Sequence, residues 1–535
     1  MRFRHFLLAL GVVGIAWLGY WLAGTAAPPP RLRVETPEVV PKRRVIADEP
    51  APRFRRGERV PAFRRDEEAA QAGALPGQRS LIFTDRAALE NFLKRAGDRV
   101  RVMGRLDALN ALRIGFLSSD DLAGLLDGSE ELGLIFPVDI PPPVEGSAQA
   151  GAVALGAGLL DWLGITGDNS AWGNGVRIAI LDTGVTASQA FASSISSINL
   201  VDLPADLSKQ NGHGTAVASM IIGRDSLTPG VAPGAEIVSI RIANDLGQSD
   251  SYLLAQGIVA AVDAGAKLIN ISLGGSDSAL VKNAIEYARV AGALIIAASG
   301  NNGQDRVKFP AANAGVIAVG AVDALSNHLD FSNTGSEVAI SAPGFGVNAA
   351  WTGNQATSVS GTSFSTPIVV GAIAALMSQP GSAKLTGPQA YNLLLAYLND
   401  GGEAGADAAL GGGMPDLGRA LNGKTRGLRD AAVASQRVLP PTAGFPNGQL
   451  EVLVQNRGTE TLINTGVRIS TPSGVVTSNI TSLAANAVST VRVPIPRIQD
   501  SGMRYETTVN LSNGRPDAKP SNDRRAETYV PARGK

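Results

Sequence analysis

Three segments of this chain carry an aspartate, a histidine and a serine in positions suited to catalysis. Asp182 directly follows a short apolar run, His213 lies between two glycines at the start of an apolar helical pattern, and Ser363 precedes an Ala-rich apolar run. A serine hydroxyl is a poor nucleophile until a neighbouring base accepts its proton, and imidazole, with a pKa of about 6.5, can do so near neutral pH. A carboxylate that holds the ring completes a set suited to acyl transfer.

Each of these residues taken alone also has an ordinary structural explanation. A serine at a helix start is a common cap, and an aspartate after a strand is often a turn residue. The histidine is more informative, because the chain has only three. His5 lies in the apolar N-terminal leader and His328 in a polar loop, so His213 is the histidine available to this chemistry.

The elements that must position these residues follow from the hydrophobic pattern between residues 172 and 422. Short apolar runs alternate there with helical patterns, which is typical of a mostly parallel, doubly wound sheet with helices on both faces. In such sheets the functional crevice lies beyond the carboxyl ends of the strands. The expected strands are residues 176–181, 236–242, 267–272, 293–298 and 315–322, with helices at 252–264 and 279–291.

An asparagine follows one of these expected strands, in the segment Ser-Gly-Asn-Asn-Gly at residues 299–303. An oxyanion needs hydrogen-bond donors placed in advance, and loss of one such donor typically lowers kcat about 10²–10³-fold. We expect Asn301 to supply one donor and the Ser363 backbone N–H the other. Asn301 taken alone could equally be a turn residue.

Together these segments resemble the subtilisin-like serine proteases, the subtilase family. The resemblance covers residues 172–422 and rests on the Asp-Thr-Gly, His-Gly-Thr, Gly-Asn and Gly-Thr-Ser-x-Ser-x-Pro segments, in the chain order Asp, His, Ser. It implies a serine endopeptidase that hydrolyses polypeptide substrates through an acyl-enzyme, acting as a monomer. It also implies that an extended peptide pairs with one edge and that a second segment helps to wall the pocket for the residue before the cut. The residues of that edge are Ser272, Leu273 and Gly274, and those of the second segment are Ala298, Ser299 and Gly300.

The chain departs from the family pattern in two places. After His213, the usual second histidine and glycine of the motif are replaced by Ala216 and Ser219, which we expect to serve packing. The loop at residues 223–229 has only Asp225 as an acidic group, whereas a calcium site needs several oxygen ligands. We therefore assign no calcium site and expect no other metal or cofactor; because members of the family often bind calcium elsewhere, calcium stays an alternative for which the sequence offers no site.

The N-terminus predicts export. Arg2 and Arg4 precede an apolar run at residues 6–23, so we interpret residues 1–27 as a signal peptide or a membrane anchor. The protein would then be periplasmic, at the cell surface or extracellular. Residues 28–79 are rich in proline, arginine and acidic residues, and we expect a disordered linker there.

Residues 80–140 predict a small β-α-β-β-α-β unit. This unit resembles the inhibitory propeptide found in front of many secreted subtilisin-like proteases, which implies an intramolecular inhibitor; the alternative is an unrelated ferredoxin-like module. Residues 141–158 would be a processing linker, with self-cleavage between Pro143 and Ala157.

The C-terminal part changes to an alternating apolar pattern. We expect a catalytic unit at residues 159–422, a linker at 423–446 and an Ig-like β-sandwich of about seven strands at 447–535. The sandwich could bind a partner or act as a plain spacer. The overall fold prediction is therefore α/β, with a small α+β domain in front and a β-sandwich behind.

Composition excludes several other functions. The 47 basic and 47 acidic residues balance, so nothing favours nucleic-acid binding, and the absence of cysteine excludes disulfides, thiolate zinc sites and a cysteine nucleophile. One alternative is a surface binding or adhesion protein on a catalytically dead subtilase scaffold. A dinucleotide-binding protein is disfavoured, because no Gly-x-Gly-x-x-Gly segment follows the first strand of the sheet.

Overall fold

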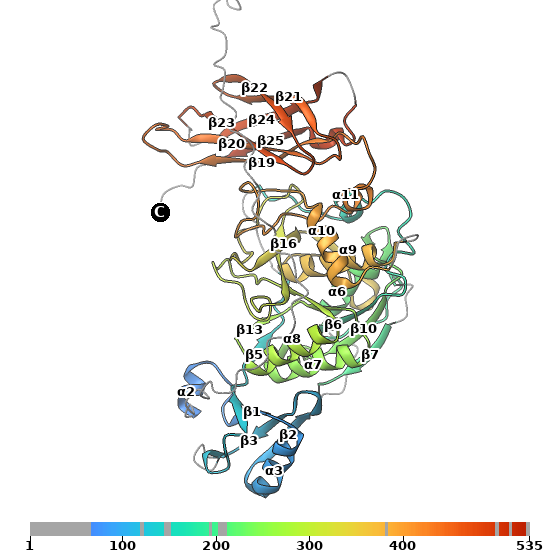
Figure 1. Ribbon diagram of the computed structural model, residues 1–535, viewed down its shortest axis with the longest axis vertical. Helices are drawn as coiled ribbons and strands as arrows, with labels where there is room; N and C mark the ends of the chain where they lie inside the picture. The colour runs from blue at the N-terminus through green and yellow to red at the C-terminus, as the bar shows by residue number, and fades with distance from the viewer. Residues whose placement is uncertain are drawn as a thin grey trace, which may run out of the picture.

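A parallel sheet of seven strands forms the centre of the computed structural model (Figure 1). The small N-terminal unit lies at one end of this central part and the C-terminal strands lie at the other. The structure describes residues 66–117, 122–143, 151–191, 195–201, 211–379, 384–497, 502–512 and 516–530.

All neighbouring strands of the central sheet run parallel. Most are short apolar runs with nearly every residue buried, as expected for a parallel sheet that is covered on both faces. In spatial order the strands are β16 (Val338–Pro343), β15 (Val316–Val322), β14 (Leu294–Ala298), β12 (Leu268–Ile271), β6 (Arg177–Asp182), β10 (Glu236–Arg241) and β7 (Ile195–Asn199). The two outermost strands were not expected, because β7 alternates with serine and β16 ends in proline.

Helices pack on both faces of the sheet, which confirms the doubly wound α/β fold. One face carries α6 (His213–Ile222), α9 (Thr362–Met377) and α10 (Gly387–Ala396), and the other carries α7 (Ser251–Asp263) and α8 (Ala279–Val290). Helix α9 is buried along nearly its whole length, so its apolar sequence shows no polar face. Shorter elements of this part are α5 (Leu159–Trp162), β8 (Arg224–Asp225), β9 (Thr228–Pro229), β17 (Val347–Trp351), β18 (Gln355–Val359) and α11 (Leu417–Asn422).

The N-terminal unit is an antiparallel sheet of four strands in the order β2-β3-β1-β4, with α3 packed on it. Its sheet faces α7 and α8. Arg113 of β3 forms an ion pair of 2.8 Å with Asp250, the residue that caps α7, and its guanidinium lies over the Tyr252 ring. The elements are β1 (Gln78–Phe83), α3 (Arg86–Ala96), β2 (Arg101–Leu106), β3 (Ala111–Gly115) and β4 (Glu130–Gly133).

The next strand, β5 (Pro137–Asp139), leaves this unit and joins the central part. It lies between β11 (Gln248–Asp250) and β13 (Gly274–Gly275) in a separate antiparallel sheet of three strands. Val138 and Ile140 are buried in the same core as α7 and α8. A strand that precedes the central part in the sequence is thus hydrogen-bonded to it.

Two expected connections contain ordered elements. The linker expected at residues 28–79 is wrong at its end: α2 (Asp66–Gln71) lies there, with Ala69 fully buried, and β1 begins at Gln78. This helix is too short and too polar to show a hydrophobic periodicity in the sequence. Residues 155–158 of the expected processing linker are docked, since Leu155 N–H donates to Phe345 O (3.1 Å) and Gly156 bridges to Val347. These contacts are made by backbone atoms, so the residue types of this segment do not predict them.

The N-terminal signal or anchor segment, residues 1–27, lies outside the described residues. In the part of the chain that is described, no helix combines the length and apolar character needed to cross a membrane.

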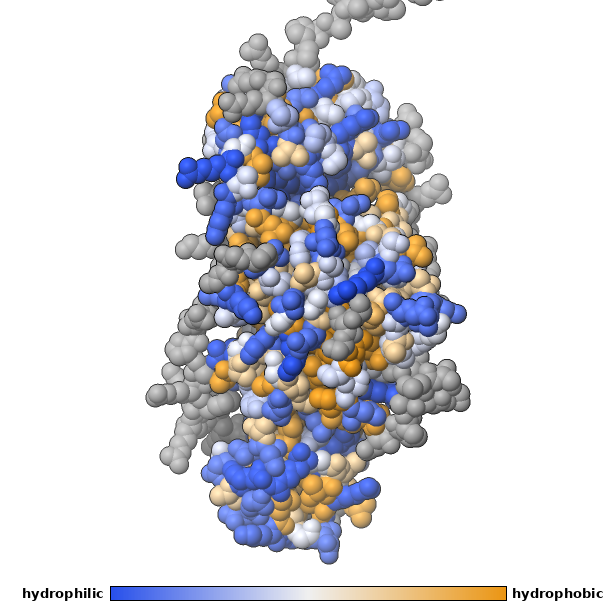
Figure 2. Space-filling model, turned by 90° about the vertical axis from the view of Figure 1, so that its right-hand side faces the viewer, coloured by the Kyte–Doolittle hydropathy of each residue, from blue (hydrophilic) through white to orange (hydrophobic). Residues whose placement is uncertain are grey.

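The C-terminal part consists of two antiparallel sheets, β19-β20-β23 and β22-β21-β24-β25, packed around one apolar core. On the face seen in Figure 2, hydrophilic side chains predominate over this end of the molecule. The strands are β19 (Ala431–Leu439), β20 (Gln449–Asn456), β21 (Leu462–Thr471), β22 (Gly474–Leu483), β23 (Val488–Pro494), β24 (Met503–Asn510) and β25 (Arg524–Tyr529).

The linker expected at residues 423–446 is wrong, because it contains β19. This strand pairs with β20, and its first six residues are all buried. One of them, Ala434, packs in a small cluster that includes Ala404 of the central part. A strand that is covered on both faces lacks the alternation by which the other strands of the sandwich are recognised.

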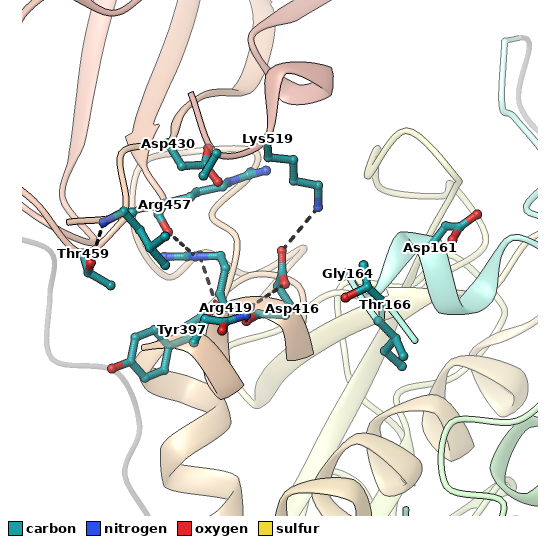
Figure 3. A pocket seen from close by; sticks show the side chains of 16 residues that line it. Asp161, Gly164, Thr166, Tyr397, Asp416, Arg419, Asp430, Arg457, Thr459 and Lys519 are labelled. Atoms are coloured by element: carbon teal, nitrogen blue, oxygen red, sulfur yellow. Dashed lines mark hydrogen bonds and ion pairs between the residues drawn. The ribbon is translucent and has the colours of Figure 1, made fainter. Parts of the chain in front are cut away.

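A buried arginine connects the sandwich to the central part, beside a cavity of about 320 Å³ (Figure 3). Arg419 of α11 donates to Tyr397 O, Leu398 O and Asn399 Oδ1 on its own side, at 2.7–3.1 Å. On the sandwich side it donates to Arg457 O (3.1 Å) and Asn486 Oδ1 (2.6 Å). One guanidinium therefore satisfies acceptors from both parts.

Candidate active site

The aspartate and histidine expected from the sequence meet at the carboxyl edge of the sheet. Asp182 is the last residue of β6, and His213 is the first residue of α6. His213 Nδ1 lies 3.0 Å from Asp182 Oδ1 and 2.9 Å from Oδ2, and both residues are fully buried. A nitrogen this close to two carboxylate oxygens carries the proton, because only a donor is attracted to both.

The other ring nitrogen is therefore the acceptor. Among the described residues, His213 Nε2 has no hydrogen-bond partner. The ring packs against Phe364, with the ring centroids 5.1 Å apart. Burial without a partner leaves the lone pair of Nε2 ready to take a proton from a neighbouring group.

Ser363 is the second residue of α9 and is buried near the same edge. Its hydroxyl donates to Ser272 O (3.2 Å) and not to His213. In return, Ser272 Oγ donates to Ser363 O (2.7 Å), which ties the helix start to the end of β12. As one of the first helical residues, Ser363 has a backbone N–H without an intrahelical acceptor, and the positive end of the helix dipole lies there.

Asn301 lies against the residues just before Ser363. Its Oδ1 accepts from Thr362 N–H (2.8 Å) and from Thr362 Oγ1 (2.7 Å). A backbone N–H can only donate, so this contact assigns Oδ1, and Nδ2 is a donor group that makes no hydrogen bond to the described residues. A Cβ on Gly361, whose φ is 144°, would lie 3.0 Å from Asn301 Nδ2. Glycine is required there both for that backbone angle and for this close approach.

The six residues expected to bind substrate, together with Gly275 next to them, form two segments, which we call the first and second cleft walls. The first wall, residues 272–275, follows β12; Ser272 and Leu273 are buried, so Leu273 offers a substrate its backbone only. The second wall, residues 298–300, begins at the end of β14. Gly274 pairs in register with Asp139 of β5, so a segment of the chain itself lies where a peptide is expected to pair.

Three residues that support the site were not singled out from the sequence. Thr183 N–H donates to Asp182 Oδ1 (2.8 Å), and Thr362 holds Asn301. Both belong to the quoted motifs, which could have identified them. Asn333 is fully buried, and its Oδ1 accepts from the N–H groups of Asn302 (3.1 Å) and Gln304 (3.3 Å). It braces the loop that carries Asn301 from a distant part of the chain, which local spacing does not reveal.

Other ionisable groups do not form a metal site in the described residues: no cluster of three or more His, Asp or Glu side chains is placed to hold an ion. The remaining described histidine, His328, follows β15, and burial lowers the pKa of its imidazole. The imidazole, carboxylate, hydroxyl and amide expected from the sequence thus lie at one sheet edge, a set that suits acyl transfer.

Comparison with known proteins gives a family for the central part. The family model described as the subtilase family matches residues 173–413. A thermostable alkaline protease from Halalkalibacterium halodurans is 36% identical over 253 residues, covering 46% of this chain and 68% of that protein. Subtilisin DY from Bacillus licheniformis is 36% identical over 214 residues, covering 39% of this chain and 78% of that protein.

A solved structure extends the likeness in fold. The epidermin leader peptide processing serine protease from Staphylococcus aureus superposes with a TM-score of 0.54 at 21% sequence identity. The match covers 65% of this chain and 99% of that one. At this identity the likeness concerns the fold alone.

Proposed function

Since this chain belongs to the subtilase family, we propose that it is an exported serine endopeptidase that is made as a self-processing zymogen. The observation that carries the proposal is the buried His213–Asp182 pair. Ser363 lies near the same edge of the sheet, in the first turn of α9. Family membership accounts for protease activity; the roles of individual residues, the zymogen and the export are our proposals.

In the proposed mechanism, His213 acts first as a base and then as an acid. Its Nε2 accepts the proton as Ser363 Oγ attacks the carbonyl carbon of the scissile bond, and then passes that proton to the leaving amine. Asp182 holds the ring in the tautomer with Nδ1–H and stabilises the imidazolium. Water hydrolyses the acyl-enzyme with the same histidine as base. For this to begin, the Ser363 hydroxyl must rotate from Ser272 O toward Nε2.

The oxyanion formed at each step is bound by two donors. Asn301 Nδ2 is one, since Oδ1 of the same amide is engaged by Thr362. The Ser363 N–H at the start of α9 is the other, supported by the helix dipole. Asn333 keeps the Asn301 loop in position by accepting two backbone N–H groups from it.

Residues 80–140 act as an inhibitor in the proposed zymogen. Support comes from β5, which pairs with both β11 and β13 and so covers the edge of the first cleft wall. Beyond Asp139 the antiparallel register leads the chain back along this wall, toward Ser272 and Ser363. The expected cut, between Pro143 and Ala157, falls partly outside the described residues. Export rests on the apolar N-terminal segment alone.

A fluorophosphonate probe, which labels an activated serine, tests the catalytic part of the proposal. We expect labelling of the wild-type protein after processing and none in Ser363→Ala. Ser365→Ala is the matched control, because it removes a buried hydroxyl of the same helix start that donates to Pro343 O (3.2 Å); this variant should still be labelled. Labelling that persists in Ser363→Ala would reject the proposed nucleophile.

N-terminal sequencing of the same proteins tests the zymogen. We expect a new N-terminus between Pro143 and Ala157 in the wild type and an uncut chain in Ser363→Ala. An uncut chain in both proteins, with probe labelling intact in the wild type, would reject self-processing and leave the catalytic proposal standing.

A further inference from the structure

A lysine lies between the two cleft walls, and its backbone joins them. The Lys308 N–H donates to Ser299 O of the second wall (3.0 Å). The next carbonyl, that of Phe309, accepts from Gly275 N–H of the first wall (2.8 Å), and these two residues form a β-bridge. Two consecutive residues therefore close one end of the space between the walls.

The Lys308 side chain packs into that space. A Cβ built on Gly274 would lie 2.9 Å from Lys308 Cδ, and a Cβ built on Gly300 would lie 3.2 Å from Lys308 Cγ. The first separation is shorter than real Cβ contacts, so glycine at position 274 leaves room for the methylene stem. The second is a tight contact, and a Cβ on Gly300 would first meet Asn333 Nδ2, at 2.5 Å. The stem thus fills part of the pocket that the walls form.

The charge at the end of this stem has no counter-ion among the described residues. Lys308 is half-buried, and no residue in the described part of the chain gives its ammonium a hydrogen bond or an ion pair. An ammonium without a partner can form a charge-assisted hydrogen bond with an incoming anion.

We propose that Lys308 makes this enzyme selective for an acidic residue, Glu or Asp, immediately before the scissile bond. The inference rests on the proposed function, since it assigns the pocket between the two walls to that substrate residue. A carboxylate there would meet the ammonium in a charge-assisted hydrogen bond, whereas a large apolar side chain would meet the lysine stem and bury the charge.

Four peptide substrates test the proposal. They are identical except for Glu, Gln, Leu or Lys before the scissile bond, and kcat/KM is measured with the processed wild-type enzyme. Glu and Gln have nearly the same shape, so their ratio isolates the charge. We expect Glu to be preferred over Gln by about tenfold or more, as for hydrogen bonds to charged groups, and this preference to shrink in 1 M salt, which screens charges beyond about 3 Å.

Two variants assign the preference to this residue. Lys308→Met keeps an unbranched stem without the charge, so its Glu/Gln ratio should fall to about one, and Lys308→Glu should turn the preference toward the Lys substrate. Lys267→Met is the control, because Lys267 is an exposed lysine just before β12, at the opposite edge of the sheet; its Glu/Gln ratio should match the wild type.

Two results would overturn the proposal: equal kcat/KM for Glu and Gln in the wild type, or an unchanged ratio in Lys308→Met. If the fluorophosphonate probe labels Ser363 and the Leu substrate is the best of the four, only the lysine assignment fails. If neither labelling nor cleavage occurs, the proposed function fails with it.

Discussion

Replacing Asp182 by asparagine should inactivate the enzyme through the tautomer of His213. Oδ1 of Asp182 accepts from Thr183 N–H at 2.8 Å, a contact that only an oxygen can make. In Asp182→Asn, the amide oxygen must therefore keep this place, which puts the NH₂ group where Oδ2 now lies, 2.9 Å from His213 Nδ1. Two donors cannot face each other, so Nδ1 must become the acceptor and the ring proton must move to Nε2.

The size of the effect follows from this forced tautomer. A histidine with its proton on Nε2 cannot accept the proton of Ser363, and a wrong tautomer of this kind lowers kcat by about 10⁴-fold. That factor corresponds to about 5.5 kcal/mol of lost transition-state stabilisation. Water cannot offer residues 182 and 213 alternative hydrogen bonds, because both side chains are fully buried. KM should change little, since neither residue belongs to the cleft walls.

The assay is steady-state hydrolysis of a peptide substrate, with the rate of fluorophosphonate labelling as a second measure of the same base. Both should fall together in Asp182→Asn. Because self-processing would also be lost, the variant is matured by an added protease and compared with wild type treated in the same way. Asp263→Asn, an exposed aspartate at the end of α7, is the control and should keep wild-type kcat. A kcat within tenfold of the wild type in Asp182→Asn, with an unchanged circular dichroism spectrum, would refute the argument.

Two further predictions concern the sandwich. Arg419→Met removes the five side-chain hydrogen bonds given above for the described residues. Each buried acceptor left unpaired costs about 1–3 kcal/mol, and water from the adjacent cavity can replace some of the bonds, so we expect the free energy of unfolding to fall by about 2–4 kcal/mol. Calorimetry should then show the sandwich unfolding earlier than the central part, and a single unchanged transition would contradict this. Burial, with the nearby Asp517 and Asp430, raises the pKa of Asp523 to about 7. Such a carboxyl holds its proton longer in the folded state, so its destabilising effect is absent below about pH 4 and grows as pH rises to about 7; Asp523→Asn should therefore raise the Tm at pH 8 and leave it unchanged at pH 4, and an equal shift at both pH values would show that charge is not the cause.

The sequence by itself determined the fold class of the central part and the residues of its candidate site. Short apolar runs and helical periods are local signals, and they placed Asp182, His213 and Ser363 at the ends of elements that parallel-sheet topology brings to one edge. The expected doubly wound sheet is confirmed, and the strand and helix ranges differ from the expected ones by a residue or two.

The same local signals failed where burial or pairing comes from distant parts of the chain. Strand β19 shows no alternation because both of its faces are covered, and α2 is too short to show a period. The pairing of β5 with the first cleft wall joins residues more than a hundred positions apart. No pattern in either segment alone encodes that contact.

Only the tertiary structure decided the details on which the proposed specificity and catalysis depend. Thr362 assigns the free donor of Asn301, Asn333 braces its loop, and Lys308 enters the pocket between two glycines. Nothing in the sequence distinguishes Lys308 from the other lysines, because its proposed role depends on which backbone segments approach its side chain. Residue types set which chemistry was available, and long-range packing set which atoms could take part in it.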